Sequence, residues 1–345
     1  MKTKVIVTLL LIAAVVLGCA ACTACTACTP SGTTAGSSGK DAGLMIGVSL
    51  PTQREQRWVV DHTGFLEAAE KAGVRVIVQI ADNNAARQQA QCENLITMGA
   101  KALIVAPHDE GAAVNIVNMA HEAKIPIISY DRQIGSPDID CLATFDQYRI
   151  GYAMGEYMAQ NLEKGNIIFL KGDPGDSTCI PLANGAKDAM KAKLDSGAFI
   201  IVAEQDCIDW EPSAALRHTE NALTANRNNI QGVIAPNDGT AGGAIQALAA
   251  QGLAGKVIVT GQDCETDAVK RIIAGTQSMT VQFDCMAMSA GALDAAIKLA
   301  NGASGVGEYH SDYGVSTLIY DVIKIDRNNW QWLIEAGFFS EADFE

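Results

Sequence analysis

Short apolar runs alternate with helical segments along most of this chain. Near the centre, an apolar run over residues 232–235 ends in Pro236-Asn237-Asp238 and is followed at once by a Gly- and Ala-rich segment typical of a helix. A second apolar run, residues 256–260, ends in Gly261-Gln262-Asp263. Apolar runs in this alternation are typical of buried parallel strands joined by crossover helices. The pattern therefore predicts an α/β fold of doubly wound parallel sheets.

The alternation forms two series of elements. In the first, helices that end before a glycine are expected at 58–72 and 85–98, and strands are expected at 44–50, 74–80, 102–106 and 125–130. Glycine directly after a helix favours the left-handed C-cap. In the second series, a helix is expected at 286–299, and strands are expected at 166–170, 199–203, 231–235, 256–260 and 279–283, with a last apolar run at 318–325.

A chain of 345 residues exceeds the usual size of a single core, so two lobes are expected. No long Gly/Ser linker interrupts the folded region, which indicates that short hinges join the lobes. A single large sheet is the alternative arrangement.

The N-terminus has the features of a secretion signal. Lys2 and Lys4 precede an apolar core at residues 5–17, and Val16-Leu17-Gly18-Cys19 has the form of a lipoprotein cleavage box. The prediction is a signal peptide over residues 1–18, a lipid on Cys19 and a low-complexity tether over residues 19–43. The alternative is an ordinary signal peptide cut nearby. In both cases the mature protein is extracytoplasmic, and the predicted anchor attaches it to the cell membrane, in a periplasm or at the cell surface.

The ten cysteines indicate neither a metal site nor a catalytic thiol. Cys19 and the three cysteines of the repeat ACTACTACT at residues 21–29, Cys22, Cys25 and Cys28, have a spacing similar to that of iron–sulfur ligands. A tether after the lipid is favoured because no scaffold surrounds them. The other six form no CxxC pair. Cys179 and Cys207 could bridge, although scattered buried thiols are favoured. We therefore expect no cofactor and no metal.

The net charge of −14 limits the possible partners. After the signal the chain carries no basic patch or run of Arg and Lys. This composition argues against binding to nucleic acid and against docking onto anionic lipid by charge alone.

Polar side chains follow three of the expected strands: Asp131-Arg132, Asn237-Asp238 and Gln262-Asp263. In parallel sheets ligands bind beyond the carboxyl ends of the strands. Carboxylates accept hydrogen bonds and amides both donate and accept them, which suits the vicinal hydroxyls of a sugar. The alternative for Asp131 and Arg132 is a purely structural ion pair.

Four sequence blocks carry a resemblance to a known family: SLPTQREQRW at 49–58, ENALTAN at 220–226, NDGTAGGAIQALAAQGLAGKV at 237–257 and AGTQSMTV at 274–281. They closely resemble the sugar-binding members of the type I periplasmic binding proteins, which serve ABC transporters, and in particular the xylose-binding and multiple-sugar-binding kinds. The resemblance covers residues 44–339.

The resemblance implies a ligand site with no catalytic residues. The matching residues, with Trp210 as the ring that stacks on the sugar, are Arg57, Trp58, Asp131, Arg132, Trp210, Asn237, Asp238 and Asp263. Phe283 stands where the xylose-binding relatives have a lysine, and Ser177-Thr178 stands where the family has an Asn-Asn pair. These departures concern which sugar binds. For Trp210 the alternative role is a core residue.

The resemblance also implies two doubly wound lobes joined by a multi-strand hinge, with a first lobe of residues 44–145 plus 286–315 and a second of 146–285 plus 316–345. We expect a monomer that closes on one aldopyranose, D-xylose or D-glucose first, and delivers it to the permease of an ABC importer. Two alternatives remain. One is a lipoprotein that presents sugar to a membrane sensor. The other is a secreted carbohydrate hydrolase, which needs two carboxylates in the cleft. No catalytic motif is present, so we expect no enzyme.

Overall fold

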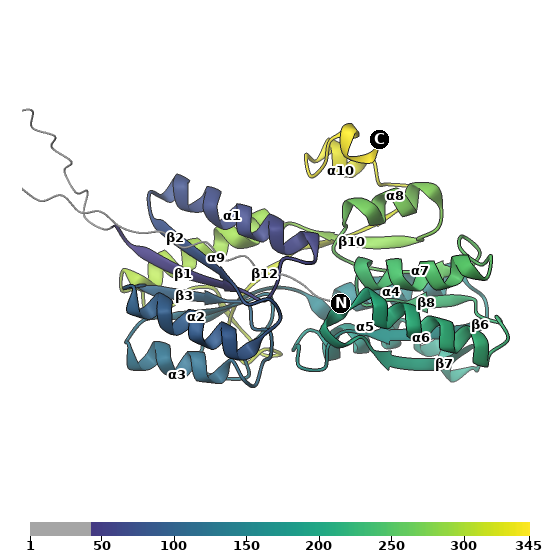
Figure 1. Ribbon diagram of the computed structural model, residues 1–345, viewed down its shortest axis with the longest axis horizontal. Coiled ribbons are helices and arrows are strands. Elements are labelled where there is room, and N and C mark those ends of the chain that lie inside the picture. The colour runs from purple at the N-terminus through teal and green to yellow at the C-terminus, as the bar shows by residue number, and fades with distance from the viewer. Residues whose placement is uncertain (1–42) are drawn as a thin grey trace, which may run out of the picture. The chain divides into compact units, whose positions relative to one another are not determined.

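The computed structural model describes residues 43–345 (Figure 1). The predicted signal peptide, the lipid-bearing Cys19 and nearly all of the predicted tether lie outside the described residues. Within the described part of the chain, no helix is both long enough and apolar enough to cross a membrane.

The first lobe is built on a seven-stranded sheet in the order β11-β12-β5-β4-β3-β1-β2. Only the pairing of β11 with β12 is antiparallel. The strands are β1 (Met45–Leu50), β2 (Arg75–Ile80), β3 (Ala102–Val105), β4 (Ile127–Tyr130), β5 (Cys141–Phe145), β11 (Glu308–His310) and β12 (Val315–Tyr320).

Helices cover both faces of this sheet. In Figure 1, α1 and α9 lie together on one side of it, and α2 and α3 lie on the other. Gly64 of α1 permits the close contact with α9, since a Cβ atom there would lie 2.1 Å from Ser289 Oγ. The bounds are α1 (Gln56–Ala72), α2 (Ala85–Thr97), α3 (Val114–Glu122) and α9 (Cys285–Ala300).

The second lobe contains a parallel sheet in the order β7-β6-β8-β9 and a separate antiparallel pair, β10 with β13. Successive side chains of a strand point to opposite faces. Accordingly, Ile167 and Phe169 join one core and Ile168 and Leu170 another. The strands are β6 (Gly165–Lys171), β7 (Phe199–Asp206), β8 (Gly232–Ile234), β9 (Ile258–Val259), β10 (Met279–Phe283) and β13 (Val322–Asp326).

Paired helices pack onto these two faces, α4 with α5 and α6 with α7. Near the C-terminus, α10 and η2 form a small apolar cluster with Cys264, Val269 and Ile325. The bounds are α4 (Gln147–Asn161), α5 (Cys179–Asp195), η1 (Ile208–Trp210), α6 (Pro212–Ala225), α7 (Asp238–Ala250), α8 (Thr266–Ala274), α10 (Trp332–Glu335) and η2 (Glu341–Phe344).

The chain passes between the lobes three times, each time through a short connection. These connections are β5 to α4 at residue 146, β10 to α9 at residue 284 and β12 to β13 at residue 321. The single large sheet considered as an alternative is not formed, because the strands fall into three separate sheets.

The end of the expected first lobe needs a correction. The predicted apolar run at 318–325 is two strands that belong to different sheets. Thr317 pairs with Leu142 in the first lobe, whereas Ile325 pairs with Thr280 in the second. Residues 316–320 therefore lie in the first lobe and not in the second. Hydrophobicity alone shows no change at residue 321, because both strands are apolar and only their hydrogen-bond partners differ.

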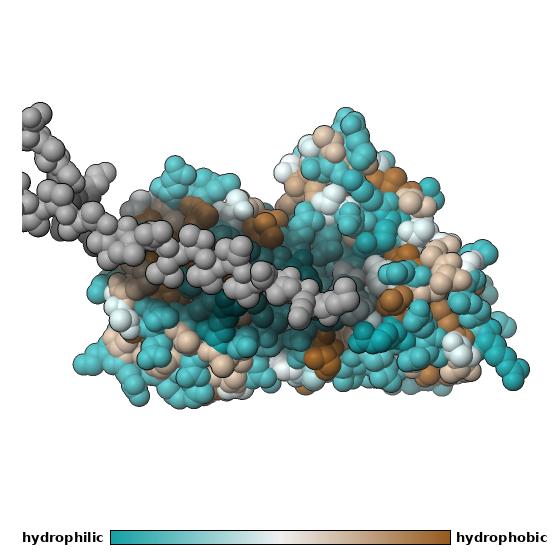
Figure 2. Space-filling view, viewed as in Figure 1, coloured by the Kyte–Doolittle hydropathy of each residue, from teal (hydrophilic) through white to brown (hydrophobic). Residues whose placement is uncertain are grey.

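The six described cysteines, which include Cys179 and Cys207, are free and buried. Burial raises the pKa of Cys92 and of Cys207 to about 12, so their thiols stay protonated near neutral pH. Within residues 43–345, no group of three or more His, Cys, Asp or Glu side chains is placed to hold a metal ion. The surface face in Figure 2 is mostly hydrophilic, and its apolar side chains lie in small separate groups.

Candidate functional site

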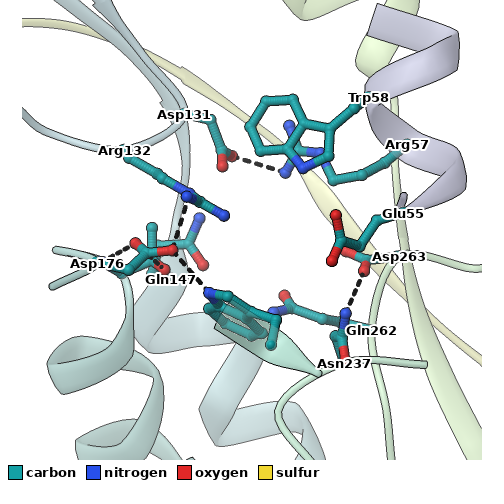
Figure 3. A pocket seen from close by; sticks show the side chains of 12 residues that line it. Glu55, Arg57, Trp58, Asp131, Arg132, Gln147, Asp176, Asn237, Gln262 and Asp263 are labelled. Atoms are coloured by element: carbon teal, nitrogen blue, oxygen red, sulfur yellow. Dashed lines mark hydrogen bonds and ion pairs between the residues drawn. The ribbon is translucent and has the colours of Figure 1, made fainter. Parts of the chain in front are cut away.

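A cavity is lined by polar and aromatic side chains from both lobes (Figure 3). They lie at the start of α1 and beyond the carboxyl ends of β4, β5, β6, β7, β8 and β9, which is where ligands bind in parallel sheets. The lining residues are Glu55, Arg57, Trp58, Asp131, Arg132, Gln147, Asp176, Thr178, Trp210, Asn237, Gln262 and Asp263.

Arg57 is fixed between two carboxylates of the first lobe. Its Nη1 donates to Asp131 Oδ1 at 2.9 Å, and its Nε and Nη2 donate to Asp61 Oδ2 at 3.2 and 3.1 Å. Asp61 is fully buried and also accepts a hydrogen bond from Tyr130. Burial raises the pKa of Asp61 to about 6, although Arg57 and Tyr130 act against that shift. The guanidinium group is therefore held in place before any ligand enters.

Asp131 reaches the cavity through an unusual backbone conformation. Its φ of 62° is left-handed, and the Thr144 hydroxyl stabilises this turn by donating to the Asp131 carbonyl at 2.7 Å. Figure 3 shows the Asp131 carboxylate at the cavity, next to Arg57. Since Asp131 Oδ1 is bonded to Arg57, the second oxygen of the carboxylate is available to accept from a ligand.

Asp176 links the two lobes. Its Oδ2 accepts from Arg132 Nε at 2.8 Å and from Trp210 Nε1 at 3.1 Å. Its Oδ1 accepts from the Thr178 backbone and hydroxyl at 2.9 and 2.7 Å. One buried carboxylate thus sets the orientation of an arginine from the first lobe and an indole from the second.

Two indoles lie on different sides of the cavity. Trp58 carries both arginines on its ring, with Arg57 Cζ at 4.2 Å and Arg132 Cζ at 5.3 Å from the ring centroid. Trp210 lies against Gly172, where a Cβ atom would approach its ring to 2.4 Å. Trp210 lines the cavity, yet it is buried, with only 7 % of its surface exposed. It is therefore both a core residue and a lining residue.

The third side of the cavity is formed by Asn237, Gln262 and Asp263. Asn237 caps α7, its Oδ1 accepting from the Thr240 backbone at 2.9 Å, while its Nδ2 donates to Asp263 Oδ2 at 3.3 Å. Gln262 Nε2 donates to the Pro236 carbonyl at 2.8 Å. Burial raises the pKa of Asp263 well above its ordinary value, with Arg57 opposing the shift.

The predicted ligand residue Asp238 does not line the cavity. It is fully buried, and its carboxylate accepts from Gln277 Nε2 at 2.6 Å, from Thr280 Oγ1 at 2.7 Å and from the Glu265 backbone at 3.1 Å. Asn237 and Asp238 are adjacent, and their side chains point to different sides of the strand end. Asn237 therefore borders the cavity, while Asp238 joins α7 to β10 and the loop before α8.

The predicted residue Phe283 also lies outside the cavity lining. Its ring stacks on Phe145 with centroids 4.4 Å apart, beside two of the connections between the lobes. Arg57 Cζ lies 5.2 Å from the Phe283 ring centroid. Phe283 therefore supports Arg57 from behind rather than facing a ligand.

The seven other predicted residues are brought together as lining residues: Arg57, Trp58, Asp131, Arg132, Trp210, Asn237 and Asp263. Two further lining residues, Gln262 and Thr178, stand at positions that were already noted in the sequence, at a strand end and in place of the family's Asn-Asn pair. Three lining residues were not predicted: Glu55, Gln147 and Asp176. Asp176 follows the end of strand β6, so the strand-end rule could have identified it. Gln147 follows β5, a strand that was not predicted, and no comparable signal marks it.

Comparison with known proteins assigns the family. Residues 46–304 match the model of a periplasmic binding protein domain. The D-xylose-binding periplasmic protein of Escherichia coli is 36 % identical over 304 residues, which cover 87 % of this chain and 92 % of that protein.

The chain belongs to the periplasmic binding protein family.

Solved structures of other members of this family agree with the two-lobe fold. A carbohydrate transporter solute-binding protein from Chloroflexus aurantiacus, in complex with D-glucose, has a TM-score of 0.82 at 30 % identity, covering 88 % of this chain and 98 % of that one. The Caulobacter myo-inositol-binding protein, bound to myo-inositol, has a TM-score of 0.76 at 27 % identity, covering 86 % and 97 %. The predicted type I periplasmic binding protein fold is thus confirmed. Such relatives are extracytoplasmic solute-binding proteins.

Proposed function

We propose that this chain binds one neutral aldopyranose in the cavity between its lobes and delivers it to an ABC importer. The observation that carries the proposal is the composition of the cavity. Two indoles, two fixed guanidinium groups and several carboxylate and amide groups surround one space. The apolar face of a pyranose stacks on an indole, while its hydroxyls both donate to and accept from the polar groups.

The charge pattern supports a neutral ligand. Both cavity arginines already have carboxylate partners, Arg57 with Asp61 and Asp131, and Arg132 with Asp176. An acidic sugar would have to compete with these carboxylates and would meet Asp263 in addition. A neutral sugar leaves the ion pairs intact and uses the remaining donors and acceptors of the same groups.

D-xylose and D-glucose are the favoured ligands, followed by galactose and arabinose. The relatives named for xylose and crystallised with glucose support this order. Phe283 stands where the xylose-binding relatives have a lysine, which suggested a changed sugar preference. Its ring lies behind Arg57, so it acts on the ligand only through the Arg57 side chain.

A thermal-shift panel tests the proposal. The panel contains pentoses, hexoses, inositols and disaccharides, each at a concentration well above a micromolar dissociation constant. A ligand that binds only the folded state raises the melting temperature with its occupancy. The expected result is a shift with xylose or glucose. If myo-inositol alone shifts the melting temperature, the ligand is a cyclitol and the aldopyranose assignment is wrong. If no compound does, sugar binding itself is contradicted.

The two other functions considered for this chain have their own tests. A carbohydrate hydrolase would release reducing ends from oligosaccharides, and we expect none because the cavity carboxylates are engaged with Arg57, Arg132 and Asn237. If the chain is a sensory lipoprotein, it binds the same sugar, but deleting its gene leaves sugar uptake unchanged. If it is a transport component, the deletion abolishes sugar uptake.

The proposed lipid on Cys19 is tested by metabolic labelling with a fatty acid. Cys19→Ala should prevent the labelling.

A further inference from the structure

Two helices from different lobes begin close to each other, and neither is capped by its own N-cap side chain. Helix α1 begins at Gln56 in the first lobe, and α8 begins at Thr266 in the second. The N-cap residues, Glu55 and Glu265, make no side-chain hydrogen bond to their own helices. Glutamate is not among the residues that favour this position. The first N–H groups of both helices therefore need partners from elsewhere in the chain.

The partners come from the opposite lobe. The Thr266 backbone N–H donates to Gln56 Oε1 at 2.9 Å, and Gln56 Nε2 donates to Thr266 Oγ1 at 3.0 Å. The Gln56 backbone N–H donates to Glu265 Oε1 at 3.3 Å. The start of each helix thus supplies the acceptor for the first N–H group of the other. We call these three hydrogen bonds the reciprocal cap. They exist only when the two lobes are in contact.

The reciprocal cap lies beside the sugar cavity without being part of it. Gln56 and Thr266 are not among the lining residues of the cavity. Arg57, which directly follows Gln56, and Asp263, three residues before Thr266, do line it. Gln56 is exposed, so water can reach its side chain when the lobes separate. A group that does not contact the ligand can change affinity through the equilibrium between the open and closed forms.

We propose that the reciprocal cap is a latch: Gln56 and Thr266 are positioning residues that favour the closed form and so set the affinity for the sugar without contacting it. The inference rests on the proposed sugar-binding function. The apparent dissociation constant equals the intrinsic constant divided by the fraction of protein in the binding-competent form. Loss of the latch therefore weakens the binding of every sugar by the same factor. A residue that contacts the ligand changes the affinities of different sugars by different factors.

Calorimetry and stopped-flow tryptophan fluorescence with D-glucose and D-xylose test the latch. Gln56→Ala removes both side-chain bonds of Gln56 and should weaken the binding of both sugars by about three- to tenfold. Thr266→Val removes only the hydroxyl and should weaken both by about two- to threefold. In each variant the ratio of the two dissociation constants should equal that of the wild type. The dissociation rate should rise by the same factor as the dissociation constant, because the latch forms only after the lobes meet.

Three further variants serve as controls. Thr266→Ser keeps the hydroxyl and should retain the wild-type affinity and dissociation rate. Gln53→Ala removes an exposed hydrogen bond to His62 within the first lobe and should leave both quantities unchanged. Thr266→Val in the Gln56→Ala background should cause no further loss, since the hydrogen bond that both substitutions remove is already absent.

The outcomes separate the latch from the proposed function. Unchanged affinity and an unchanged dissociation rate in Gln56→Ala would overturn the latch and leave sugar binding intact. A loss of affinity that differs between glucose and xylose would show that Gln56 acts on the ligand itself, which also overturns the latch. A wild type that binds neither sugar would overturn the proposed function and the latch with it.

Discussion

At the scale of single residues, Asp131 and Asp238 are both buried but have different kinds of partners. Asp131 faces the cavity and shares one oxygen with Arg57, whereas both oxygens of Asp238 are bonded to Gln277, Thr280 and the Glu265 backbone. The position of a carboxylate relative to the cavity should therefore decide whether its loss affects affinity or stability.

We predict that Asp131→Ala weakens sugar binding by about 1–3 kcal/mol or more, because a ligand hydroxyl and Arg57 both lose a buried partner. Asp238→Ala should instead lower the free energy of unfolding by about 1–3 kcal/mol, since three donors are left unpaired, and change affinity by less than about tenfold. Calorimetry and urea unfolding measure the two quantities. Equal losses of affinity in the two variants would contradict the placement of Asp238 outside the cavity.

Asp238 should also make stability depend on pH. Burial raises its pKa in the folded state from 3.8 to about 7. A group with a raised folded pKa binds more protons in the folded than in the unfolded state between these values. Its contribution to stability is therefore fully present below pH 3.8 and is lost as pH rises through about 7.

In Asp238→Asn this titration is removed. We predict that the free energy of unfolding of the wild type falls relative to that of Asp238→Asn as pH rises from about 4 to about 7, and then stays at a constant difference. Urea unfolding at intervals of one pH unit measures it. Parallel curves for the two proteins over this range would show that Asp238 does not titrate there.

At the scale of elements, the contact between α4 and α5 depends on small residues. A Cβ atom at Gly155 would lie 2.1 Å from the Ala186 carbonyl oxygen, and one at Gly151 would lie 1.8 Å from the Leu182 carbonyl oxygen. These are backbone atoms, which cannot rotate away as a flexible side chain can. The two helices can keep this distance only if the positions remain glycine.

We predict that Gly155→Ala lowers the free energy of unfolding by about 1–3 kcal/mol through overpacking. Gly305→Ala is the matched control, since a Cβ atom there meets no other atom within 4 Å. Thermal and urea unfolding of both variants provide the measurement. If the two substitutions have the same effect on stability, then α4 and α5 separate at little cost and the contact is not tight.

At the scale of the whole molecule, the cavity is formed by side chains from both lobes. Arg132 of the first lobe binds Asp176 of the second, and Arg54 of the first lobe pairs with Glu211 of the second. The three short connections at residues 146, 284 and 321 are the positions at which the lobes can move relative to each other. Closure by hinge motion around a ligand is known for such binding proteins.

We predict that a saturating sugar lowers the radius of gyration, because the ligand adds contacts to both lobes and favours the closed form. Small-angle scattering with and without xylose or glucose measures it, and a non-binding sugar from the thermal-shift panel serves as control. Arg132→Ala should reduce the ligand-induced change, since it removes a contact between the lobes. An unchanged radius of gyration in the presence of bound sugar would contradict closure.

Local sequence was sufficient to predict most of the alternating strands and helices, although not β5, and most of the cavity lining. Strand β10 at 279–283 and helix α9 near 286–299 follow the predicted limits closely, because a buried strand must be apolar and a helix must show its own period. Arg57, Trp58, Asp131, Arg132, Trp210, Asn237 and Asp263 line the cavity as predicted from the family motifs, and most of them lie at strand ends, where parallel sheets place their ligands.

Only the tertiary structure decided which sheet a strand joins and which way a polar side chain points. The apolar run at 318–325 divides at residue 321 because its halves pair with Leu142 and with Thr280, which are distant in sequence. The Asp238 carboxylate points away from the cavity because Gln277 and Thr280 donate hydrogen bonds to it. The Glu55 carboxylate points toward the cavity because Arg54 donates a hydrogen bond to it. The sequence around each residue specifies its type and its element, but its partners come from elsewhere in the chain.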